Sequence, residues 1–192
     1  MKTIKVPKGK SFRSFLVRSG ACWEARSWVG KKSLRTAWRT CERADWMLHL
    51  ADEAEIDRKT LVTLACYVAK SVLKYVPANN NRPRLALDMA ESWCRGELSA
   101  IEVSKATRLL IETFEKECVK PTQQELEASY AAFEAAESVY SINAAAYVSD
   151  VIHGAAYASN RRGVVRGGGK LYADMIRSRI PVELIASGLE GK

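Results

Sequence analysis

The chain has 192 residues, of which 47% are hydrophobic and 27% charged. This is ordinary globular composition, and it excludes a collagen-like chain, extensive disorder and a disulfide-stapled miniprotein. A chain of this length can bury about 70% of its unfolded surface around one core. The apolar run Phe15-Leu16-Val17 is too short for a signal peptide, and no run is long enough to cross a membrane. We therefore expect a cytoplasmic protein without a membrane partner.

The formal charge of +8 is unevenly distributed along the chain. Residues 1–40 carry eleven basic residues and one acidic residue, whereas residues 41–160 carry twelve basic and eighteen acidic ones. Residues 161–179 are basic again, with six basic residues and one acidic residue. The sequence thus predicts two basic segments around an acidic middle, and converging basic segments would form a patch for an anionic partner.

The first twelve residues have no helical period, and we expect a basic arm or at most a short strand there, followed by a single α-helical domain over residues 13–192. The clearest helix is predicted over 58–76, with Asp57 at its N-cap and Pro77 after it. Pro83 suits the first turn of the next helix, and Gly96 its end.

Two sequence patterns match the capping box, in which a Ser or Thr and a Glu three positions later satisfy backbone donors. They are Ser99 to Glu102 and Thr122 to Glu125, and each predicts the start of a helix. The alanine-rich stretch 124–159 is one helix or two, with a break near 141–143. Residues 163–169 are a glycine-rich breaker, and a short helix follows over 171–179. Strand patterns are absent beyond residues 3–6. The predicted fold is all-α, a compact multi-helix bundle or a short α-solenoid-like stack.

Four of the five tryptophans lie within residues 23–46. Trp28, Trp38 and Cys41 fall among apolar positions, which favours a place in the core, and Asp45 suits a cap of the following helix. Trp23 is the best candidate for an exposed aromatic anchor at an interface.

This segment resembles the Imm-5-like family of putative immunity proteins, which are α-helical and lie near polymorphic toxin genes or stand alone. The resemblance extends over most of residues 20–185. The residues that carry it are Ala21-Cys22, Glu24-Ala25, Trp28, Ser33, Ala37-Trp38, Cys41, Arg43 to Leu48, Arg82-Pro83, Ala86, Trp93, Gly96, Tyr172 to Arg177 and Ile180-Pro181. His49 departs from the family pattern, which is mostly apolar there. The resemblance implies an inhibitor or binding protein and names no target.

Candidate catalytic chemistry is sparse. The five cysteines show no metal-ligand spacing and fit a reduced protein. His49 and His153 each have an aspartate nearby in sequence, Asp45 and Asp150, and an Asp–His pair is either an acid–base dyad or a surface hydrogen bond. No nucleophile or ligand cluster completes a catalytic set, so we predict no enzyme, no cofactor and no metal.

A glycine-rich stretch, Arg166-Gly-Gly-Gly-Lys170, offers backbone donors and a lysine as a phosphate loop does. It departs from that motif at Val164 and Leu171, where a glycine and a Ser or Thr belong. We interpret it as a hinge.

The leading functional hypothesis is a non-enzymatic protein that neutralises a toxin or defence effector by steric occlusion. Its predicted partner-binding residues are Trp23 and the acidic run Asp52, Glu53, Glu55 and Asp57. The alternative is a nucleic-acid-associated protein of phage or plasmid type that binds phosphates and makes no sequence-specific contacts with the bases. The predicted phosphate contacts are Lys2, Lys5, Lys8, Lys10, Arg161, Arg162, Arg166 and Lys170. The sequence does not determine the partner's identity or the oligomeric state.

Overall fold

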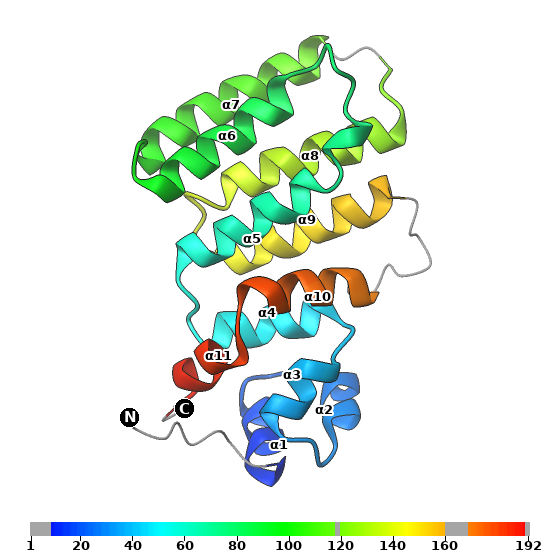
Figure 1. Ribbon diagram of the computed structural model, residues 1–192, viewed down its shortest axis with the longest axis vertical. Helices are drawn as coiled ribbons and strands as arrows, with labels where there is room; N and C mark the ends of the chain where they lie inside the picture. The colour runs from blue at the N-terminus through cyan, green and yellow to red at the C-terminus, as the bar shows by residue number, and fades with distance from the viewer. Residues whose placement is uncertain (1–8, 118–119, 160–168, 191–192) are drawn as a thin grey trace.

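The computed structural model describes residues 9–117, 120–159 and 169–190, with side chains from Phe12 onward. In these ranges the chain forms eleven α-helices and a short 3-10 helix and contains no strand, which confirms the all-α prediction (Figure 1). The elements are α1 Gly9–Arg18, α2 Trp23–Val29, α3 Leu34–Thr40, α4 Ala44–Glu53, α5 Arg58–Lys70, η1 Leu73–Tyr75, α6 Arg82–Arg95, α7 Ala100–Glu117, α8 Gln123–Glu137, α9 Ala144–Ala158, α10 Gly169–Arg179 and α11 Val182–Gly188.

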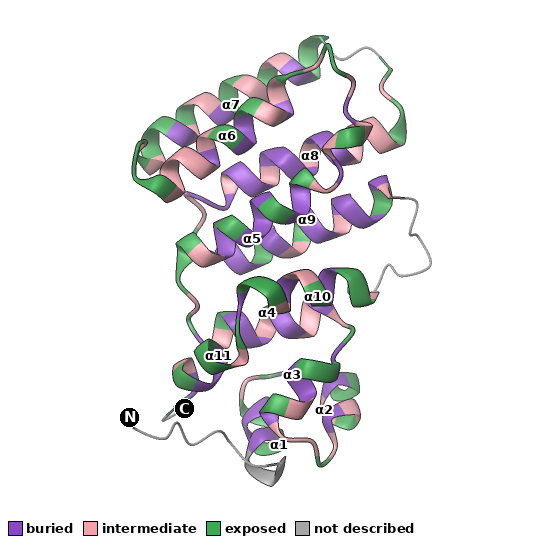
Figure 2. Cartoon of the chain, in the orientation of Figure 1, coloured by how far each residue is buried: buried purple, intermediate pink, exposed green. Residues whose placement is uncertain are grey.

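The helices succeed one another in layers along the long axis of the molecule (Figure 1). Helices α6 and α7 lie at one end, and α1, α2 and α3 lie at the other. Helix α9 packs against α8, α5 and α4, and the late helix α10 returns to pack on α4 and α5. The central helices are therefore buried on more than one side, which Figure 2 shows as the concentration of buried residues on α5, α8 and α9.

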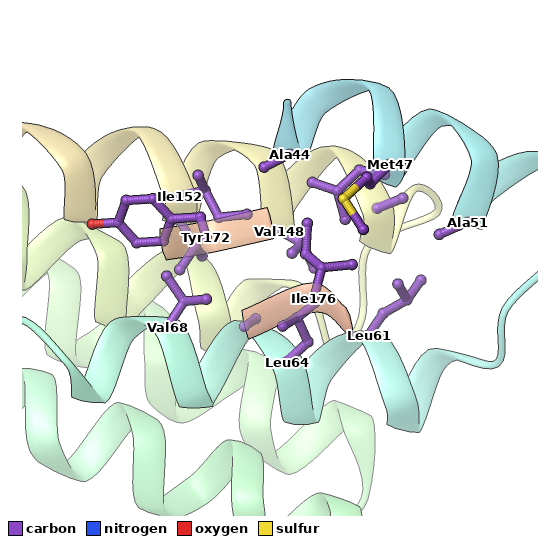
Figure 3. Packing of buried hydrophobic residues seen from close by; sticks show 14 of the residues in the cluster. Ala44, Met47, Ala51, Leu61, Leu64, Val68, Val148, Ile152, Tyr172 and Ile176 are labelled. Carbon is purple, nitrogen blue, oxygen red and sulfur yellow. The ribbon is translucent and has the colours of Figure 1, made fainter. Parts of the chain in front are cut away.

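Side chains from four helices meet where α10 returns to the centre of the stack. Figure 3 shows Met47 of α4, Leu64 of α5, Ile152 of α9 and Ile176 of α10 close together. All four are at most 2% exposed. Burying apolar area of this kind is the main favourable term in folding, so this contact joins the C-terminal helices to the rest of the molecule.

Three predicted helix starts are confirmed in detail. The Asp57 carboxylate accepts a hydrogen bond from the backbone N–H of Thr60 at 3.0 Å and caps α5. In the first capping box, the Glu102 carboxylate accepts the Ser99 N–H, and the Ser99 hydroxyl accepts the Glu102 N–H. The second box, between Thr122 and Glu125, has the same pair of bonds and begins α8.

The predicted helix ends are confirmed in part. Pro83 lies in the first turn of α6, and Gly96 ends that helix with a left-handed φ of 83°. The alanine-rich stretch is two helices, α8 and α9, separated at residues 138–143. Helix α5 ends at Lys70 and is followed by a turn and the 3-10 helix, so the prediction of one helix over 58–76 was wrong at its C-terminal end.

The beginning of the chain differs from the prediction. Helix α1 starts at Gly9, so the last four residues of the expected arm are helical. Phe12, Phe15 and Leu16 are buried, and their three- and four-residue spacing places them on one face of α1. Residues 1–8 lie outside the described residues.

Helix α4 begins differently from the prediction. Its N-cap is Arg43, which makes no side-chain cap hydrogen bond, and Asp45 lies in the first turn. The Asp45 carboxylate accepts two hydrogen bonds from the Arg43 guanidinium, at 2.9 and 2.5 Å. The prediction that Asp45 caps the helix was therefore wrong, because a fork-shaped guanidinium two residues away binds both carboxylate oxygens.

Helix α11 was not predicted, and it packs closely on the end of α4. A Cβ atom added to Gly188 would lie 2.0 Å from the carbonyl oxygen of Ala54. Only a glycine fits at this distance, because real Cβ atoms do not approach backbone oxygens so closely. Pro181 is the N-cap of α11, so the proline that ends α10 also starts the next helix.

Candidate functional site

An apolar hollow lies in the tryptophan-rich end of the molecule. It has a volume of about 560 Å³ and is lined by side chains of α1, α2, α3, α4 and, from far along the chain, His153 of α9. Pockets of 300–1,000 Å³ with apolar walls and a few polar groups are typical binding sites. Helices α2, α3 and α4 carry the four tryptophans of residues 23–46, whereas α1 lies before that segment.

Three indole rings form much of the cavity wall. Trp38 is 3% exposed, as predicted for a core residue, while Trp28 and Trp46 are half-buried and pack against each other with ring centroids 5.8 Å apart. The Nζ atom of Lys32 lies 4.2 Å from the Trp28 ring centroid, and the Arg43 guanidinium lies 4.5 Å from the Trp46 ring centroid. These cation–π contacts hold the two rings in place as a wall.

The two histidines both line this cavity, although 103 other residues separate them in the sequence. The predicted Asp45–His49 pair is replaced by other contacts: Asp45 binds Arg43, and the His49 Nε2 atom lies 3.4 Å from the Ser19 hydroxyl. Only part of this cavity could be predicted from the sequence. The tryptophan density marked the wall, but nothing in the sequence linked His153 to it.

Two cysteines, Cys22 and Cys41, line this cavity. Burial raises the pKa of the Cys41 thiol, whose S–H donates to the Arg43 carbonyl oxygen at 3.4 Å. The Cys22 sulfur accepts the Ala25 N–H and caps α2. Both thiols therefore serve local structure, and the described residues contain no group of three or more potential metal ligands.

The predicted exposure of Trp23 is confirmed, since 67% of this residue is accessible. Trp23 is the first residue of α2, and its neighbours Cys22 and Glu24 both line the cavity. Its predicted role in partner binding is a proposal that follows from this position.

The acidic run Asp52, Glu53, Glu55 and Asp57 spans the end of α4 and the turn into α5. Asp52, Glu55 and Asp57 are exposed, and Glu53 is half-buried. Partial burial by itself would raise the pKa of Asp57, but hydrogen bonds from Thr60 outweigh it and lower the pKa. Asp57 is thus occupied as a helix cap, and Glu55 adopts a positive φ of 52° in the turn.

A second group of carboxylates, which the sequence analysis did not single out, lies across α8 and α9. Burial raises the pKa of Glu134 to about 8, and repulsion from Asp150, Glu137 and Glu127 adds to the shift. Burial also raises the pKa of Glu137, which a hydrogen bond from Tyr140 partly offsets. None of these four carboxylates takes part in the ion pairs found among the described residues. This group is hereafter the α8–α9 carboxylate cluster, and no ion pair with a described Lys or Arg compensates its charge.

The predicted phosphate contacts fall mostly beyond the described residues. Lys2, Lys5, Lys8, Arg161, Arg162 and Arg166 lie outside them, as does most of the glycine-rich stretch, and Lys10 lies in α1 at a position whose side chain is not described. Lys170 is exposed and forms an ion pair with Asp174 at 2.5 Å.

The described helices thus define an all-α protein with one aromatic cavity and one carboxylate cluster. A profile of the Imm-5 like putative immunity protein family matches residues 53–160, more than half of the chain. The protein belongs to this family, as the resemblance predicted. The match includes the carboxylate cluster and His153, whereas the tryptophan-rich segment lies before it.

No curated protein and no solved structure matches the chain at a significant level. In the described part of the chain, no helix is both long and apolar enough to cross a membrane.

Proposed function

We propose that this protein is a non-enzymatic immunity protein that binds a toxin or defence effector and blocks it by steric occlusion. Membership of the immunity family supports the general role, and the α8–α9 carboxylate cluster is the observation that carries the choice of partner. The partner would present a basic surface to this cluster.

The carboxylate cluster is unfavourable in the free protein. Burial disfavours the charged form of Glu134, and repulsion from Asp150, Glu137 and Glu127 adds to this, which is why the pKa of Glu134 is raised to about 8. A Lys or Arg of a partner placed among these carboxylates would remove the repulsion and favour their charged forms. Complementary charge also speeds the encounter of two proteins and discriminates against wrong partners. Such a cluster lowers the stability of the free protein, and binding of a basic partner would raise it again.

This proposal places the principal acidic face on α8 and α9 rather than on the run Asp52 to Asp57. Asp57 already caps α5, whereas Glu134 and Asp150 make no ion pair within the described residues. The acidic run and Trp23 remain proposed secondary contacts, because both include exposed side chains able to reach a partner.

The test begins with capture of partners from the native host lysate by the tagged protein, with nuclease treatment in parallel and mass spectrometry as readout. We expect one stoichiometric protein partner that survives nuclease. Recovery of many proteins only in untreated lysate would contradict the proposal and favour the phosphate-binding alternative.

The second step measures binding of the captured partner to charge-reversed variants. We expect Glu134→Lys with Asp150→Lys to weaken binding at least 100-fold, because attraction is turned into repulsion. Glu112→Lys is the matched control, since Glu112 is exposed on α7 and outside the cluster. Equal affinity of both variants would show that the cluster is not the binding face.

A further inference from the structure

We propose that the cavity at the tryptophan-rich end binds an uncharged, planar aromatic small molecule that carries a hydrogen-bonding group. This proposal is independent of the partner-binding function, because the carboxylate cluster lines no part of the cavity. The cavity has a volume of about 560 Å³, which falls within the range of small-molecule sites.

The shape and chemistry of the wall favour an aromatic ligand. Trp28, Trp38 and Trp46 surround the hollow, and Phe12 and Met47 complete its apolar lining. Aromatic rings bind other flat rings in stacked or edge-to-face geometry, and a methionine sulfur adds favourable contact with a ring edge. A wall so rich in rings recognises a flat aromatic molecule better than an aliphatic one.

The charges around the cavity favour a ligand without net charge. The Asp45 carboxylate and the Arg43 guanidinium neutralise each other through two hydrogen bonds. A cationic ligand would compete with Lys32 and Arg43, whose charges already lie over the Trp28 and Trp46 rings. Of the Asp, Glu, Lys and Arg residues that line the cavity, Glu24 and Asp45 are acidic and Arg43 is basic, so an anionic ligand would meet an excess of carboxylates. Each sign of charge is thus opposed by a group already present.

Polar groups in the wall point to a hydrogen-bonding substituent on the ligand. His49 and His153 reach the cavity from α4 and α9, and each imidazole can donate or accept. The indole Nε1 of Trp38 is buried and has no hydrogen-bond partner among the described residues. A buried donor without a partner is costly, and an amide or carbonyl oxygen on the ligand would supply the missing acceptor.

The experiment compares three probes that share one ring system: 2-naphthamide, 2-naphthoate and 2-naphthylmethylamine. Each is titrated into the full chain by calorimetry, and the indole N–H resonances are followed by NMR, with Trp38 assigned through Trp38→Phe. We expect saturable binding of the amide with a Kd on the order of 0.1–1 mM, as suits a ligand of this size. The charged analogues should bind at least tenfold more weakly, and the Trp38 resonance should shift with the amide.

Variants locate the site. Ala25 lines the cavity, so Ala25→Leu should fill it and weaken 2-naphthamide binding at least tenfold. His153→Ala should weaken it about fivefold or more by removing a polar partner, and it provides the same test if Ala25→Leu fails to fold. Trp93→Phe is the control for Trp38→Phe, because Trp93 lies on α6 and outside the cavity lining, and it should leave binding unchanged.

Three results would overturn the proposal: no saturable binding of the amide, equal binding of the three probes, or amide binding that both Ala25→Leu and His153→Ala leave intact.

Discussion

The alanine-rich centre and the tryptophan-rich end of this molecule show two opposite ways of packing helices. In α8 and α9, alanines let the two backbones approach closely. A Cβ added to Gly154 of α9 would lie 3.2 Å from the Glu127 carbonyl oxygen of α8. In α2, α3 and α4, large indoles meet at angles and leave a cavity of about 560 Å³. Close packing of this kind contributes stability, so the first region is the better candidate for the stable centre, whereas the second contains a hollow.

The largest expected effect tests whether the centre is the more tightly packed region. Phe133 is fully buried, and its ring lies 5.4 Å from that of Phe114 and 6.2 Å from that of Tyr130 between centroids. Phe133→Ala should lower the free energy of unfolding by about 3–5 kcal/mol. Trp28→Ala, at the half-buried cavity wall, should lower it by only about 1–2 kcal/mol, chiefly through the lost contact with Trp46. Urea denaturation of both variants measures the difference, and equal losses would remove the distinction between the two regions.

The second prediction concerns pH and the carboxylates on the surface of the alanine-rich pair. Because the folded protein raises the pKa of Glu134 to about 8, protonated Glu134 favours the folded state. This contribution is complete below the unfolded pKa near 4.5 and is lost as the pH rises through about 8. Glu134→Gln should therefore be about 2–4 kcal/mol more stable than the parent at pH 9 and nearly equal to it at pH 4.

The free energy of unfolding is measured by urea denaturation at pH 4, 7 and 9 for the parent, Glu134→Gln and Glu112→Gln. The Glu112→Gln control distinguishes the effect of Glu134 from that of the other titrating groups. Glu112 is exposed on α7, so its variant should follow the parent at every pH. If Glu134→Gln gains no stability relative to the parent between pH 4 and pH 9, the repulsion between Glu134 and its neighbouring carboxylates is already relieved.

The third prediction extends the close-packing argument to α11. Gly188→Ala should lower the free energy of unfolding by about 1–3 kcal/mol, because the added Cβ would collide with the Ala54 carbonyl and force α11 from α4. Ser187→Ala is the neighbouring control at an exposed position and should change stability by less than about 0.5 kcal/mol. Thermal unfolding followed by circular dichroism measures the stability of both variants. Equal melting temperatures of Gly188→Ala and Ser187→Ala would mean that α11 can move away from α4 without loss of stability.

The smallest expected effect lies at the surface of the tryptophan-rich end. Trp23 is 67% exposed, so Trp23→Ala should change the free energy of unfolding by less than about 0.5 kcal/mol. It should nevertheless weaken binding of the captured partner, since exposed aromatic anchors dominate many interfaces. A large loss of stability would show instead that Trp23 packs on the cavity mouth.

Local patterns determined most of the helical starts and several ends. Asp57, Thr122 and Pro83 act where the sequence placed them because caps and first-turn prolines depend only on residues within one turn. The end of α5 was missed because its apolar period continues into the turn and the 3-10 helix. Helix α1 was missed because its apolar stripe of Phe12, Phe15 and Leu16 is short and follows a segment with four lysines and a proline, which shows no helical period.

The candidate site was predictable only in fragments. The tryptophan density and the exposure of Trp23 could be predicted, because aromatic spacing within one segment is visible in the sequence. The cavity needed the tertiary structure, because His153 joins His49 only when α9 packs on α4. The carboxylate cluster also needed it, since Glu134 and Asp150 belong to different helices.

The sequence by itself therefore determined the all-α class, the caps at Asp57, Ser99 and Thr122, and the membership of an immunity family. The tertiary structure decided which carboxylates of α8 and α9 lie near one another, where the cavity lies and why Gly188 must be a glycine. The physical reason is one of range: helix periodicity and capping act over three to four residues, whereas cavities and charge clusters arise from side chains brought together across the whole chain.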